Sequence, residues 1–227
     1  RFVFLQHGVI MNNLSGWLNG KPIDLMVTTA QAEYDSIVMQ GSPYVLTERQ
    51  VLLSGLPRHD ELLNKKANRK TILIMPTWRN ALCGKKVGKG NIRAVNPEFE
   101  FSNYKKAWEE LLASEMLKRV SDAHGMPIVF FPHTNMFPYI EAGVLKVPDY
   151  VEVLGNQMGD SIQQVFADAS LMVTDYSSTA FETAYLGKPC VYYQFDKEEF
   201  FSGTQVYSVG YFSYDKDGFG PVVETLT

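Results

Sequence analysis

The chain has 227 residues, of which 45% are hydrophobic and 20% are charged, and its formal net charge is −4. These values suit a globular protein with a substantial core, and the negative charge argues against a general nucleic-acid-binding surface. Two cysteines, Cys83 and Cys190, are too few for a disulfide framework and fit a reducing compartment, and no apolar run approaches the roughly 20 residues of a membrane span.

The first part of the chain predicts short apolar strands. We expect them at residues 2–5, 24–27 and 51–54, with a helix at 29–40. Residues 55–60, Gly-Leu-Pro-Arg-His-Asp, follow the third strand. The last three, Arg58-His59-Asp60, could offer an acid–base pair, but we favour an ordinary loop after Pro57. The polar stretch at 64–70 reads as a linker, so we predict one domain at residues 1–68 and a second at 69–227.

The pattern of strands and helices restarts after the linker. Strands are expected at 71–75, 128–131, 151–154, 171–173 and 191–195, and helices at 103–123, 161–169 and 177–186. Apolar strands that alternate with helices indicate a parallel sheet covered on both faces. The chain opens in a strand and stops in what looks like the start of a helix, so we expect a fragment of a longer protein. A Walker loop and a G-x-G-x-x-G motif are both missing, which removes most kinases, NTPases and dehydrogenases.

A strand end followed by hydroxyl residues predicts a phosphate site. Residues 174–179 read Thr-Asp-Tyr-Ser-Ser-Thr and lead from the strand at 171–173 into the helix at 177–186. Backbone N–H groups at a helix start, the positive end of its dipole and the hydroxyls of Ser177 and Ser178 can together bind an anion. The alternative is that Ser177 only caps the helix. Glu182 is either placed to reach a ribose diol or is simply an exposed helix residue.

Two histidines follow apolar strands, one in each half of the chain. His7 precedes Gly8, and His133 follows the strand at 128–131. A histidine in such a place can act as a general base near neutral pH, whereas a lone histidine is more often held by backbone hydrogen bonds. Two histidines in equivalent places predict a cleft shared by both halves.

The segment Pro76-Thr77-Trp78-Arg79 also ends a strand. The guanidinium of Arg79 is a planar fork suited to phosphate, or else the segment is an aromatic plug with a solvated arginine. The sequence has no paired-Cys or His-x-x-x-His pattern, so we predict neither a metal site nor a cofactor. Asp175 is expected to shape its turn through backbone hydrogen bonds.

Six segments resemble, in order, the CDP-glycerol glycerophosphotransferases, which include the poly(glycerol phosphate) polymerases that build teichoic acids and related capsule polymers. They are the strand with His7-Gly8, residues 55–60, residues 76–79, the strand-end His133, residues 174–178 and residues 214–221. The resemblance covers nearly the whole chain. It implies an α/β, GT-B-like fold with two Rossmann-like domains facing a cleft, the first present only in part. It also implies transfer of glycerol phosphate from CDP-glycerol to a hydroxyl, with release of CMP.

The resemblance also implies roles for individual residues. His7 resembles the family's proposed catalytic base on the acceptor side, and His133 its donor-side histidine near the diphosphate. Ser177 and Ser178 match the diphosphate-binding serines, and Glu182 falls where the family has an acidic residue. The substrate-binding residues expected for CDP-glycerol are Thr77, Arg79, Asp175, Ser177, Ser178, Thr179 and Glu182. After His7-Gly8 the teichoic acid polymerases read Thr-Pro followed shortly by Lys, whereas residues 9–11 here are Val-Ile-Met, so the donor is better defined than the acceptor.

The partners implied by the resemblance are CDP-glycerol and a lipid-linked or polymeric glycerol phosphate or sugar acceptor, with no nucleic acid. The implied location is cytoplasmic, peripheral on the inner face of the bacterial cell membrane through parts outside this chain. Two other hypotheses stay open. One is a GT-B glycosyltransferase or epimerase that uses another sugar nucleotide, and the other is a nucleotide-binding fragment without turnover. The polymer, its length and the oligomeric state are left open.

Overall fold

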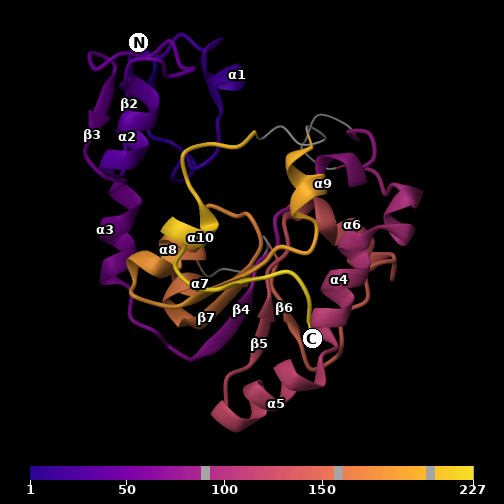
Figure 1. The fold of residues 1–227 in the computed structure, drawn as a ribbon. Coiled ribbons are helices and arrows are strands. Elements are labelled where there is room, and N and C mark those ends of the chain that lie inside the picture. The colour runs from indigo at the N-terminus through magenta and orange to yellow at the C-terminus, as the bar shows by residue number, and fades with distance from the viewer. Residues whose placement is uncertain (88–92, 156–160, 203–207, 227) are drawn as a thin grey trace.

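The computed structural model describes residues 1–87, 93–155, 161–202 and 208–226. It contains a three-stranded and a six-stranded sheet, and every strand pair in both is parallel (Figure 1). The part with the smaller sheet contains β1 Val3–Phe4, α1 Ser15–Leu18, β2 Leu25–Thr28, α2 Gln31–Val38 and β3 Val51–Leu53, and is followed by α3 Pro57–Asn64.

The larger sheet is built from the rest of the chain. Its strands are β4 Thr71–Ile74, β5 Ile128–Phe130, β6 Glu152–Val153, β7 Ala169–Thr174, β8 Cys190–Tyr193 and β9 Val222–Val223. Its α-helices are α4 Asn103–Leu112, α5 Glu115–His124, α6 Phe137–Glu141, α7 Ile162–Asp168, α8 Ala180–Tyr185, α9 Lys197–Phe201 and α10 Tyr214–Asp217. Short 3₁₀ helices occupy η1 Asn80–Leu82, η2 Pro97–Phe101 and η3 Thr134–Met136.

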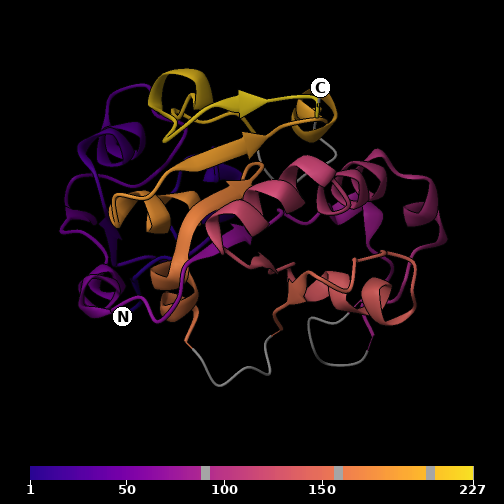
Figure 2. The ribbon, with the colours of Figure 1, turned by 90° about the horizontal axis from the view of Figure 1, so that it is seen from below.

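The large sheet has the strand order β6-β5-β4-β7-β8-β9. Counted from β4 as the first strand, this is the order 3-2-1-4-5-6 of dinucleotide-binding sheets. Figure 2 shows the orange and yellow strands β7, β8 and β9 running side by side with helices to either side of them. The order reverses between β4 and β7, and ligands of such folds bind beyond the carboxyl ends of the strands at this point.

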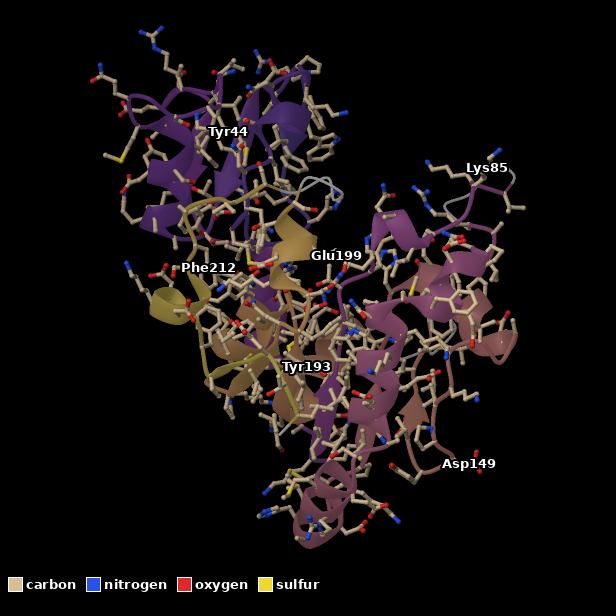
Figure 3. The ribbon with its side chains drawn as sticks, turned by 45° about the vertical axis from the view of Figure 1, so that its right-hand side comes forward. Tyr44, Lys85, Asp149, Tyr193, Glu199 and Phe212 are labelled. Atoms are coloured by element: carbon tan, nitrogen blue, oxygen red, sulfur yellow. The ribbon has the colours of Figure 1, made fainter. Side chains whose placement is uncertain are left out.

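Burial explains why the apolar runs form this sheet. Every residue of β4 and β5 is buried, and their side chains alternate between the two faces. Ile72 and Ile74 pack on one face with Trp108 of α4, while Leu73 packs on the other with Leu62 of α3 and Phe166 of α7. Each such side chain stabilises the fold by roughly 1.5–3 kcal/mol. The smaller sheet has its own core, which contains Tyr44, whereas Tyr193 belongs to the core of the larger sheet (Figure 3).

The helix predicted at 103–123 is two helices. α4 ends at Leu112, and Ser114 then caps α5 by accepting a hydrogen bond from the backbone N–H of Leu117 at 3.4 Å. The apolar stripe continues across the break, which is why periodicity alone predicts one helix.

The end of the chain forms a strand where we expected a helix to begin. β9 pairs with β8, and the carbonyl of Pro221 accepts a hydrogen bond from Tyr192 at 2.9 Å. Gly220 allows this approach, because a Cβ there would lie 1.8 Å from the carbonyl oxygen of Cys190.

Residues 57–64 form helix α3 where we expected an ordinary loop. Pro57 stands at its first turn, a position where proline is well tolerated. α3 packs against α7 and α8, so these residues lie with the larger sheet, and the boundary at residue 68 stays a prediction.

Candidate active site

A cavity of about 590 Å³ opens beyond the carboxyl ends of β1, β4, β5 and β7. It therefore lies at the point where the strand order of the large sheet reverses. The smaller-sheet part contributes one wall and the larger-sheet part the other. The lining residues are Phe4, Gln6–Asn12, Leu14, Trp17, Met75–Trp78, Phe131–Thr134, Ile162 and Tyr176–Thr179. Six predicted site residues share this cavity: His7, Thr77, His133, Ser177, Ser178 and Thr179.

The serine turn between β7 and α8 lines the cavity. Within the described residues, the backbone N–H groups of Ser177 and Ser178 have no protein acceptor. The Ser177 hydroxyl accepts from the N–H of Thr179 at 3.2 Å and lies 2.8 Å from the Thr179 hydroxyl. Ser177 thus bonds within the turn that precedes α8 and also lines the cavity, whereas the N-cap of α8 is Thr179, which makes no side-chain cap hydrogen bond. α8 begins at Ala180 rather than at 177, so residues 177–179 form a turn before the helix.

Gly8 brings the two walls together at the serine turn. A Cβ on Gly8 would lie 2.8 Å from the hydroxyl oxygen of Ser178, so only glycine permits this approach without a shift. His7 is the neighbouring residue and is exposed at the cavity wall, with the ring of Phe4 edge-on to its imidazole at 5.9 Å. The predicted acceptor-side base and the predicted diphosphate serines are therefore close in space.

His133 lies on the opposite wall and stacks on Trp78. Their ring centroids are 5.0 Å apart with an interplanar angle of 15°. Desolvation lowers the pKa of His133 below the ordinary histidine value. Its Nδ1 accepts a hydrogen bond from the backbone N–H of Asn135 at 3.2 Å, so a neutral ring carries its proton on Nε2. His133 is therefore arranged as a neutral hydrogen-bond donor.

Arg79 does not reach the cavity, contrary to our expectation that it would meet a phosphate. It is 4% exposed, and its guanidinium donates to both oxygens of Asp196, to Asp175 Oδ2 and to the carbonyl of Thr77, at 2.6–3.0 Å. Burial opposes its charge, but the carboxylates of Asp175 and Asp196 outweigh that effect and raise the pKa of Arg79. The hydrogen bonds of its guanidinium are therefore made to groups within the protein.

Asp175 is likewise absent from the cavity lining, although we placed it among the substrate-binding residues. Its Oδ1 accepts from the backbone N–H groups of Thr77 at 2.8 Å and Tyr176 at 2.7 Å. Burial raises the pKa of Asp175, and the charge of Arg79 opposes that shift. Asp175 joins the segment after β4 to the serine turn, which fits its expected part in shaping that turn.

Glu182 is buried and paired, whereas we expected it to meet a ribose or to be exposed. Its Oε1 accepts from Arg58 Nε at 3.0 Å, and its Oε2 lies 3.1 Å from Nε2 of His59. Burial would raise the pKa of Glu182, but the adjacent imidazole of His59 and the charge of Arg58 hold it below the ordinary value. Arg58 also donates to the carbonyl of His7, so Glu182 helps to fix the His7 loop.

The sequence did not single out Asp196, and it offered Arg58 and His59 only as part of a possible acid–base pair, not as partners of Glu182. Asp196 lies 117 positions from Arg79, and Arg58 lies 124 positions from Glu182, so no local pattern reveals either pair. Within the described parts of the chain, no group of three or more His, Cys, Asp or Glu side chains is arranged to hold a metal ion.

The comparison with protein families gives a match over most of the chain. Residues 13–227 match the family described as CDP-Glycerol:Poly(glycerophosphate) glycerophosphotransferase. The chain belongs to this family. The match begins after His7 and Gly8, and it includes His133 and the serine turn. The predicted family membership is confirmed.

Two curated proteins are similar in sequence. The minor teichoic acid biosynthesis protein GgaB of Bacillus subtilis (strain 168) is 38% identical over 225 residues, which are 98% of this chain and 24% of GgaB. The teichoic acid glycerol-phosphate transferase of Staphylococcus aureus (strain NCTC 8325 / PS 47) is 23% identical over 210 residues, 86% of this chain and 47% of that protein. The chain thus spans between a quarter and a half of these relatives.

The wall teichoic acid polymerase TagF is a solved structure with the same fold. It superposes with a TM-score of 0.55 at 18% identity, covering 96% of this chain and 55% of TagF. A TagF variant soaked with CDPG gives a TM-score of 0.52 at 19% identity over 88% of this chain and 44% of that chain. The expected α/β, GT-B-like fold is confirmed, and the chain spans about half of the TagF structure.

Proposed function

We propose that this chain carries the donor site and the facing base of an enzyme that transfers glycerol phosphate from CDP-glycerol to a hydroxyl. The acceptor is lipid-linked or polymeric, CMP is released, and the product belongs to teichoic acid or capsule-type polymer synthesis. The observation that carries the proposal concerns the N–H groups of Ser177 and Ser178, which have no protein acceptor among the described residues. They lie where the strand order of the sheet reverses, beside the His7 loop. Family membership supports the same donor.

In the proposed reaction His7 removes the proton of the acceptor hydroxyl. The resulting oxygen nucleophile attacks the phosphorus next to glycerol, a new P–O bond forms, and the bond from that phosphorus to the bridging oxygen breaks. The electron pair and negative charge pass to CMP. In this proposal the N–H groups of Ser177 and Ser178 and the Nε2–H of His133 stabilise this charge, since all three residues line the cavity. Preorganised stabilisation of this kind dominates phosphoryl-type transfer.

We further propose that the whole protein acts at the inner face of the bacterial cell membrane, in peripheral contact with it. None of the described helices is both long and apolar enough to cross a bilayer. A lipid-linked acceptor presents its reactive end at the membrane surface, so the contact would serve the acceptor rather than the donor.

Replacing both serines tests the donor site. In the full-length protein, Ser177→Ala with Ser178→Ala should weaken CDP-glycerol binding by about 1–3 kcal/mol, because hydrogen bonds to charged groups are lost. Isothermal titration calorimetry measures the affinity. Ser36→Ala with Ser42→Ala is a matched control, since both hydroxyls bond to backbone carbonyls outside the cavity. Wild-type affinity in a folded Ser177/Ser178 variant would leave the serines with only a structural role in the turn.

The two histidines should show different defects. His7→Ala should lower kcat with donor affinity nearly unchanged, whereas His133→Ala should weaken donor binding or slow CMP departure. His124, which is exposed at the end of α5, provides the matched control. CMP release and product mass are measured with CDP-glycerol, with UDP- and CMP-sugars as competing donors. Turnover of a sugar nucleotide without turnover of CDP-glycerol would contradict the proposed donor.

A further inference from the structure

The wall of the cavity next to His7 carries an aromatic surface that the donor site does not use. Phe4 and Trp17 both line the cavity, and their rings meet edge to face with centroids 5.9 Å apart. Phe4 makes a second edge contact, at 5.9 Å, with the imidazole of His7. An occupant resting on Trp17 is therefore held beside the proposed base, on the wall opposite Trp78 and His133.

Trp17 keeps 42% of its surface exposed even though it lines a concave site. A large aromatic side chain left open in a cavity is a common feature of binding sites, because its face offers apolar contact at low entropic cost. The C–H groups of a polyol or a sugar ring match such a face, and their hydroxyls stay directed outward.

A cation lies over one side of the Trp17 ring, which leaves the other side to an occupant of the cavity. The ammonium of Lys21 lies 5.2 Å from the centre of the Trp17 ring. Lys21 is exposed, makes no ion pair among the described residues, and lies outside the cavity lining. A phosphate at Lys21 would therefore lie outside the cavity lining, next to Trp17.

We propose that Phe4, Trp17 and Lys21 form the subsite for the acceptor's end. It takes a hydroxylated terminal unit, polyol or sugar, attached to a phosphodiester: the unit rests on Trp17 with its hydroxyl toward His7, and the phosphodiester pairs with Lys21. This assignment rests on the proposed function for the position of the base. With this subsite the cavity could hold an acceptor even though residues 9–11 are Val-Ile-Met and include no lysine.

Direct binding to the full-length protein tests the subsite without turnover. Calorimetry compares a glycerol phosphodiester oligomer, a sugar phosphodiester and the same compounds without phosphate. Trp17→Ala should weaken binding of the phosphorylated compounds about tenfold, which corresponds to roughly 1.4 kcal/mol, and Trp17→Phe should restore part of it. Lys21→Gln should remove the preference for the phosphorylated compounds. Tighter binding of the glycerol or the sugar compound decides between the two terminal units.

Matched controls separate the subsite from general effects. Phe101 is 84% exposed and lies outside the cavity, so Phe101→Ala should bind like the wild type, and so should Lys106→Gln on α4. In steady-state assays Trp17→Ala and Lys21→Gln should raise the acceptor KM and leave the donor KM unchanged. Failure of wild-type protein to release CMP from CDP-glycerol would refute the proposed function alone. Acceptor binding within twofold of wild type in both folded Trp17→Ala and Lys21→Gln would refute the subsite alone.

Discussion

Replacing Arg79 should destabilise the protein rather than simply weaken ligand binding. Arg79→Ala leaves the carboxylates of Asp175 and Asp196 buried without their shared cation, and it removes four hydrogen bonds. Breaking a buried ion pair in this way typically costs about 3–5 kcal/mol, a large part of the 5–15 kcal/mol that holds a typical domain folded. At about 2–4 °C per kcal/mol for a chain of this size, Tm should fall by roughly 6–20 °C.

The loss should depend on pH in a defined direction. Burial already raises the pKa of Asp175 even with Arg79 present, so removing the guanidinium raises it further. A carboxyl whose folded-state pKa is raised destabilises the fold when it ionises and ceases to do so as pH falls through that pKa. The stability gap between wild type and Arg79→Ala should therefore narrow as pH falls through the raised pKa of Asp175 in the variant.

Urea titrations and thermal melts at several pH values measure this gap. Arg49→Ala, at an exposed arginine, should change stability by less than about 0.5 kcal/mol. Arg79→Lys should fall between wild type and Arg79→Ala, because an ammonium cannot bridge both carboxylates as a planar fork does. An Arg79→Ala protein of wild-type stability with weakened CDP-glycerol binding would refute the reasoning. Arg79 would then be assigned to phosphate binding.

Three further expectations follow from the site. Glu182→Gln should cost about 1–3 kcal/mol of unfolding free energy at pH 7, since a charged hydrogen-bonded partner of Arg58 is lost. Because the folded-state pKa of Glu182 is depressed, this cost should disappear as pH falls through that pKa; a cost that persists in acid would contradict the pairing. NMR titration should find His133 neutral at pH 7 with its proton on Nε2, and Trp78→Ala should raise its pKa; a proton on Nδ1 would contradict the hydrogen bond from Asn135. Turnover by the full-length protein should survive EDTA, because Thr77, Tyr176 and Arg79 engage both oxygens of Asp175; restoration of a lost activity by Mg²⁺ would make this carboxylate a metal ligand.

The sequence predicted the strands and the residues at their ends because that information is local. Apolar runs identify buried strands, and the carboxyl ends of parallel strands meet at one edge of a sheet. His133, Thr77 and Ser177 accordingly line one cavity, and His7 joins them from the smaller sheet. Their chemical roles stay predictions, while their shared location is a property of the fold.

The charged residues were predicted less well because a charge does not reveal its partner. Arg79 and Glu182 looked suited to a phosphate and a ribose, but each is paired with residues about a hundred positions away. Nothing near residue 58 indicates that its guanidinium will meet a carboxylate on α8. The helical pattern of α3 was also too short to distinguish from a loop before its packing was known.

These pairings determine how the cavity can recognise a diphosphate. The lining residues include no Lys, Arg, Asp or Glu within the described chain, because Arg79 and Arg58 are held behind the walls by carboxylates. Recognition would then depend on backbone N–H groups, hydroxyls and a neutral histidine, whose positions are fixed before the ligand arrives. Glu182 orients Arg58, Arg58 holds the His7 carbonyl, and Gly8 places that loop against Ser178. These contacts tie the His7 loop to the serine turn. If one wall shifted, the proposed base and the proposed phosphate donors would therefore move together.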